Sequence, residues 1–125
     1  ETFRRLERIV NACAEAKGRD IAVLNVSKVF DAAEYFVIVS GRSDRQVQGI
    51  SNRVLDTLGE LGVKAESAEG IDEGQWVLLD FGEIVVHVFY EAAREHYDLE
   101  NLWMKAERLV VQENPVNQHL ELRAA

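Results

Sequence analysis

Two apolar runs joined by a short polar turn are the feature that most limits how this chain can fold. The first run, residues 76–80, reads Trp-Val-Leu-Leu-Asp, and the second, residues 84–89, reads Ile-Val-Val-His-Val-Phe. Both are rich in the β-branched and aromatic residues that favour strands. Gly82 lies between them and permits the backbone bend of a tight turn. We therefore predict a β-hairpin over residues 76–89.

The remainder of the chain shows helical and strand patterns in turn. Apolar residues at helical spacing predict two helices, the second opened by a Ser43/Gln46 capping box. The predicted helices cover residues 2–17 and 43–62, the predicted strands 21–26, 35–40 and, weakly, 63–66, and the predicted loop 67–75. Short helical pieces should follow the hairpin, one with Asp98 as its N-cap. The order α-β-β-α-β-β-β-α predicts an α/β fold, a mixed β-sheet with flanking helices.

The length of 125 residues suits one domain with a proper core. We place that domain at residues 1–112. Residues 113–125 contain the only proline, Pro115, and little apolar pattern. We therefore expect a flexible C-terminal tail there.

Composition limits the kinds of partner that this chain can bind. The net charge of −8 argues against a broad phosphate-neutralising face, so we expect no direct nucleic-acid readout and favour a basic protein partner. No apolar run approaches the roughly 18 residues that a membrane span needs, so we expect no membrane partner. Cys13 is the only cysteine, which rules out an internal disulfide. These features fit a cytoplasmic protein.

The sequence offers little catalytic chemistry. Ser43 and Asp44 follow a strand, where a nucleotidyltransferase would bind phosphate and Mg²⁺, but Asp44 has no close acidic partner and Asp80 could approach it only in space. Helix capping is the simpler role for Ser43 and Asp44. The three histidines lack metal-ligand spacing, and Cys13 falls on an apolar helix face, as a core residue would. We predict no catalytic residues, no metal and no cofactor.

The residues that follow the hairpin mix aromatic, basic and acidic side chains. Such a mixture is typical of a recognition surface. Two interpretations stay open for Trp76, Tyr97 and Trp103: they pack in the core, or they protrude as anchors for a protein partner. Two are likewise open for His87, a buried strand histidine bonded to a neighbour or an interface residue.

Three ordered blocks of the sequence resemble the ribosomal silencing factor family, also called the Iojap-like proteins. The blocks are residues 35–47 (YFVIVSGRSDRQV), residues 69–70 with 74–89 (EG and GQWVLLDFGEIVVHVF), and residues 94–103 (REHYDLENLW). The resemblance covers roughly residues 3–107. It implies a nucleotidyltransferase-like topology without the catalytic carboxylates, and no enzymatic activity.

The resemblance also implies a function. Family members bind the large ribosomal subunit through universal large-subunit protein fourteen and block joining of the small subunit, which lowers translation when nutrients are scarce. Organelle relatives act in large-subunit assembly, and free members often form homodimers. Carried onto this chain, the partner-facing positions are Trp76, Asp80, His87, Phe89, Arg94, Tyr97, Leu99, Glu100 and Trp103.

Overall fold

A single mixed sheet forms the centre of the fold. The computed structural model describes residues 1–124. The seven strands of the sheet lie in the order β3-β4-β5-β2-β1-β6-β7. β2 and β5 run parallel, and every other neighbouring pair is antiparallel. The strands are β1 (Arg19–Asn25), β2 (Tyr35–Gly41), β3 (Ser67–Glu69), β4 (Trp76–Asp80), β5 (Ile84–Tyr90), β6 (Glu107–Glu113) and β7 (Leu120–Arg123). The predicted α/β class with a mixed sheet is confirmed.

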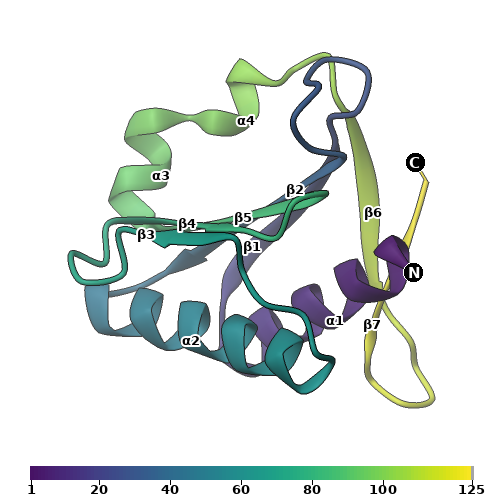
Figure 1. The fold of residues 1–125 in the computed structure, drawn as a ribbon, viewed down its shortest axis with the longest axis horizontal. Coiled ribbons are helices and arrows are strands. Elements are labelled where there is room, and N and C mark those ends of the chain that lie inside the picture. The colour runs from purple at the N-terminus through teal and green to yellow at the C-terminus, as the bar shows by residue number, and fades with distance from the viewer. Residues whose placement is uncertain (125) are drawn as a thin grey trace.

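Helices cover both faces of this sheet (Figure 1). α1 (Thr2–Glu15) and α2 (Asp44–Glu60) lie side by side on one face, and the shorter α3 (Glu91–Tyr97) and α4 (Leu99–Leu102) lie on the other. No helix within residues 1–124 is long and apolar enough to cross a membrane.

Strand alternation divides the buried apolar side chains into two clusters. On β5, Val86 and Val88 belong to the cluster under α1 and α2, together with Leu6, Ile50 and Leu58. Val85 and Phe89, at the alternate positions of the strand, belong to the cluster on the α3 side. A strand buried on both faces reads as a continuous apolar run, which is why residues 84–89 give so clear a signal.

Local sequence chemistry accounts for several element boundaries. β4 and β5 form the predicted hairpin, with Gly82 at a φ of 89° in its turn. Ser43 caps α2 as predicted, because its Oγ accepts a hydrogen bond from the Gln46 amide at 3.1 Å. The weak strand prediction was wrong in position: the strand is Ser67–Glu69, within the predicted loop. Its three exposed residues have no apolar alternation, and pairing with β4 is what makes them a strand.

The segment 113–125, expected as a flexible tail, contains a strand, β7, within the described residues; Ala125 lies outside them. β7 pairs with β6, and side chains of α1 bind its backbone. Asn11 donates to the Leu120 carbonyl at 3.0 Å and accepts from the Leu120 amide at 2.7 Å, while Glu7 accepts from the Leu122 amide at 3.0 Å. These contacts span more than a hundred residues, so local periodicity could not reveal them.

Candidate functional site

Aromatic rings gather on the α3 side of the sheet. Trp76 on β4 stands opposite Phe89 on β5, and their rings stack with centroids 5.0 Å apart. Tyr97 at the end of α3 lies 4.7 Å from Trp76 and 6.4 Å from Phe89. Phe89 is fully buried, whereas Trp76 is partly buried and Tyr97 is 49% exposed. Trp76 and Tyr97 therefore present apolar surface to solvent on a rigid aromatic base.

His87 fixes the orientation of Trp76. The indole Nε1–H donates to His87 Nδ1 at 3.2 Å, so the imidazole proton sits on Nε2. His87 is only 4% exposed, and burial lowers its pKa from 6.5 to about 4. The ring is thus neutral near pH 7. The interpretation of His87 as a buried strand histidine bonded to a neighbour is confirmed.

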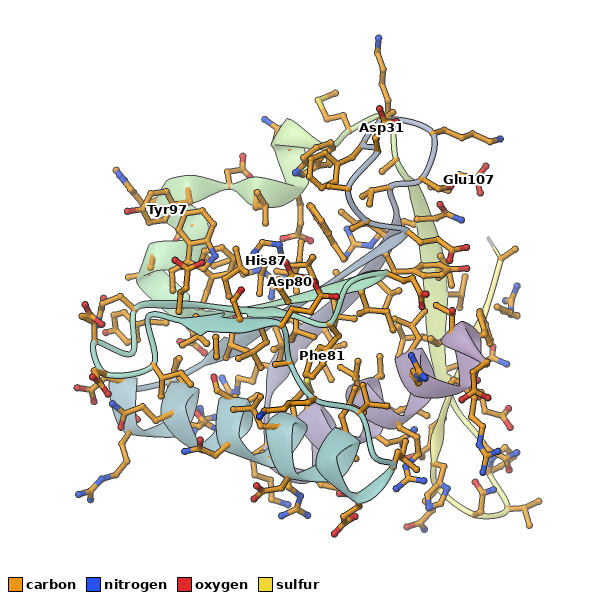
Figure 2. The ribbon with its side chains drawn as sticks, in the orientation of Figure 1. Asp31, Asp80, Phe81, His87, Tyr97 and Glu107 are labelled. Atoms are coloured by element: carbon orange, nitrogen blue, oxygen red, sulfur yellow. The ribbon has the colours of Figure 1, made fainter. Side chains whose placement is uncertain are left out.

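Asp80 closes the hairpin turn at the other end of β4. Its Oδ1 accepts a hydrogen bond from the Gly82 amide at 2.8 Å. Alternation along β4 puts Trp76, Leu78 and Asp80 on one face of the sheet, and Figure 2 shows Asp80, His87 and Tyr97 on that same side. We call Trp76, Leu78, Asp80 and Tyr97 the α3-side face. The sequence interpretation missed the half-buried Leu78, although its place between Trp76 and Asp80 on a period-two strand could have revealed it.

Arg94 and Glu100 fasten α3 and α4 to the sheet. The Arg94 guanidinium donates through Nε and Nη2 to Glu100 Oε1, at 3.0 and 2.9 Å. Its Nη1 donates to the Asp20 carbonyl at 2.6 Å and to Ser40 Oγ at 2.9 Å. The two side chains are only 12% and 25% exposed. They therefore serve first to hold the backbone that carries Tyr97.

Trp103 continues the aromatic cluster beyond α4. Its ring lies edge-on to Phe30 and Phe36, at 5.2 and 5.3 Å, and Phe36 in turn lies 4.8 Å from His87. Leu99 is buried in the same cluster. The structure therefore brings the predicted aromatic positions into one contiguous group. It adds Phe30 and Phe36, which the sequence interpretation left out because they precede the hairpin by 46 and 40 residues.

The positions considered for catalysis have structural roles. Asp44 Oδ1 accepts from the Arg45 amide at 2.7 Å in the first turn of α2. Across residues 1–124, no group of three His, Cys, Asp or Glu side chains is arranged to hold a metal ion. Burial raises the pKa of the Cys13 thiol to about 12, and the prediction that Cys13 is a core residue is confirmed.

Known proteins share this sequence and fold. Residues 1–124 match the family described as "Ribosomal silencing factor during starvation". The chain is 42% identical to the ribosomal silencing factor of Bacillus subtilis, over 74% of this chain and 78% of that protein. It is 31% identical to the mouse protein named "Mitochondrial assembly of ribosomal large subunit protein 1", over 78% of this chain and 44% of that one. A Chromobacterium violaceum crystal structure superposes with a TM-score of 0.82 at 38% identity, covering 83% of this chain and 87% of the other.

Proposed function

Because this chain belongs to the ribosomal silencing factor family, we propose that it represses translation by binding the large ribosomal subunit through universal large-subunit protein fourteen. The bound domain blocks joining of the small subunit, notably when nutrients are scarce. This role needs no chemistry, only a rigid domain placed where another surface must dock. We place its action in the cytoplasm.

The observation that carries this proposal is the α3-side face. Exposed aromatic side chains on a rigid base are the usual anchors of protein interfaces. Here Tyr97 is half exposed and is supported by Trp76, which His87 orients. Pre-organised anchors lose little conformational entropy on binding, so a small face of this kind can supply useful affinity.

Charge around this face favours a basic partner. A depression beside α3 is lined by five acidic residues and one basic side chain, Arg94, which is paired with one of them, Glu100. Its acidic residues are Asp20, Glu91, Glu95, Asp98 and Glu100. Opposite charge on a ribosomal protein speeds association and suppresses wrong orientations.

We propose different roles for the nine predicted partner-binding residues. Trp76, Asp80 and Tyr97 contact the partner directly. The others shape and hold the α3-side face from beneath or beside it, and they are His87, Phe89, Arg94, Leu99, Glu100 and Trp103. The free protein forms a homodimer, which sedimentation velocity across a concentration series tests directly.

A second candidate function is assembly of the large subunit. The name of the mouse relative supports it, since that protein is 31% identical to this chain. An assembly factor would use the same α3-side face but bind precursor subunits in preference to mature ones. Parallel binding to purified precursors and mature subunits separates the two functions.

Order-of-addition sedimentation tests the proposal. The factor is mixed with purified large subunits before or after the small subunits, and joined ribosomes are measured on sucrose gradients. We expect fewer joined ribosomes when the factor is added first. Tyr97→Ala should weaken large-subunit binding at least tenfold, as loss of an interface anchor does.

Val116→Ala is the matched control, because Val116 is 91% exposed in the turn between β6 and β7. It should bind like the unmodified protein. Equal binding by a normally folded Tyr97→Ala variant would remove Tyr97 from the site. Equal joining in both orders of addition would exclude the blocking mechanism.

A further inference from the structure

Three basic side chains line a depression at the end of the sheet where α2 begins. We call Lys17, Arg19 and Arg42 the basic patch; Ala14, Gly18 and Gln46 complete the lining of a hollow of about 610 Å³. The lining contains no acidic residue, in a chain whose net charge is −8. This local reversal of charge is the feature to be explained.

The loops that carry the basic patch are held rigidly by one side chain. Gln46 Nε2 donates to the Lys17 carbonyl at 3.0 Å, and Gln46 Oε1 accepts from the Arg42 amide at 2.7 Å. Gln46 therefore ties the turn after α1 to the turn before α2. The two turns keep a fixed separation, so the charges they carry are pre-organised.

The charges of the basic patch are largely available to a ligand. Lys17 and Arg42 are exposed and form no ion pair with any residue of the described chain. Arg19 reaches Glu91 at 3.7 Å, but both side chains are about half exposed, and such surface pairs contribute little free energy.

Three backbone amides at this helix start are already engaged by side chains. The amides of Arg42, Arg45 and Gln46 bind Gln46 Oε1, Asp44 Oδ1 and Ser43 Oγ respectively. The site therefore offers long cationic side chains and a favourable helix dipole, with three of its nearby backbone amides already engaged. That combination suits an extended polyanion, contacted by charge and without base readout.

We propose that the basic patch contacts the phosphate backbone of ribosomal RNA while the α3-side face binds the protein partner. This inference rests on the proposed function. The acidic depression begins where the basic patch ends, since Glu91 lines the first and pairs with Arg19 of the second. A basic ribosomal protein would repel the basic patch. The patch therefore stabilises the complex only where RNA phosphates lie next to that protein.

Salt dependence of large-subunit binding tests the inference. The variant is Lys17→Gln with Arg42→Gln, which removes two charges; glutamine at Lys17 meets the same left-handed φ of 67° as lysine does. The matched control is Arg4→Gln with Lys64→Gln, two exposed basic residues that also lack ion pairs in the described chain. Lys64 follows the C-terminal end of α2. That end lies about 25 Å from the start of the helix, at a rise of 1.5 Å per residue.

We expect the Lys17→Gln, Arg42→Gln variant to bind large subunits roughly tenfold more weakly at about 0.1 M salt. The slope of log K against log salt should fall in magnitude by about 2, because each of the two missing cations would have neutralised one phosphate. The control variant should match the unmodified protein. Tyr97→Ala should weaken binding with no change of slope, because it removes an uncharged anchor.

Three outcomes would overturn the inference. Unchanged affinity and slope in the patch variant would show that the patch lies away from RNA. An equal loss with isolated universal large-subunit protein fourteen would assign the patch to the protein partner. If the unmodified protein fails to bind large subunits at every salt concentration, the proposed function fails first and ribosomal RNA is excluded with it. Thermal melts of each variant establish that the fold is intact.

Discussion

Replacing Arg94 with methionine should lower the free energy of unfolding by about 3 kcal/mol. Hydrogen bonds to a charged group each contribute about 1.5–3 kcal/mol, and Arg94 makes such bonds to Glu100, Ser40 and the Asp20 carbonyl. The loss is smaller than their sum, because Glu100 keeps Arg108 at 3.3 Å and is a quarter exposed to water. Ser40 is 2% exposed, so its unpaired hydroxyl stays buried and costly.

Thermal and urea unfolding measure this effect. Unfolding entropies of about 2.1 cal/mol/K per residue make 3 kcal/mol correspond to a fall in Tm of roughly 10 °C for this chain. Arg94→Lys should lie between methionine and arginine, because a lysine keeps the charge but cannot reproduce the planar fork of donors.

Arg53→Met is the control for this prediction. Arg53 meets Glu15 at 3.0 Å, a distance like that of the Arg94 pair, but these side chains are 50% and 54% exposed. We expect a change of at most about 0.5 kcal/mol. If Arg53→Met and Arg94→Met destabilise the protein equally, burial is not what gives the Arg94 contacts their strength. Arg94 would then not be the residue that holds α3 and α4 on the sheet.

The other predictions concern the buried histidine, a glycine and the cysteine. Burial lowers the pKa of His87 to about 4, so on acidification the unfolded chain binds a proton before the folded protein does. The free energy of unfolding should therefore fall by about 3 kcal/mol as pH drops from about 6.5 to 4. Urea unfolding of His87→Leu should lack this pH dependence, and an identical dependence in both proteins would refute it. Gly70→Ala should destabilise by more than about 1 kcal/mol, because Gly70 has a φ of 85° and an added Cβ would lie 2.3 Å from the Trp76 carbonyl oxygen; an unchanged Tm would count against this geometry. Cys13, with its pKa raised to about 12, should react with a thiol reagent only as fast as the chain unfolds, and rapid labelling of folded protein would contradict its burial.

The parts of the fold that sequence predicts well are those fixed by local pattern. Residues 84–89 are buried on both faces of the sheet, and Ser43 with Gln46 forms a self-contained cap. Each signal is complete within a few residues. β3 and β7 are different. β3 is three exposed residues without an apolar alternation and depends on pairing with β4. β7 alternates over only four residues, and α1, more than a hundred residues earlier, completes its contacts.

The candidate site follows the same division. Residue type alone marked Trp76 and Tyr97 as possible partner anchors. Whether each ring is buried or exposed depended on how α3 packs over β4 and β5. In the structure, Tyr97 is half exposed, whereas Trp76 is partly buried. The bond between Trp76 and His87 follows from β4–β5 register, in which the two residues are diagonal neighbours. A one-residue slip would have destroyed it.

The contact between α1 and β7 has a consequence for biosynthesis. Asn11 and Glu7 bind the backbone of residues 120–122, and Figure 1 shows β7 lying beside α1. At about 5–20 residues per second, a translating ribosome makes Leu120 roughly 5–20 s after Asn11. During that interval Asn11 and Glu7 lack their β7 partners. β7 is synthesised after every other strand of the described chain, and it therefore completes this part of the fold by packing against α1.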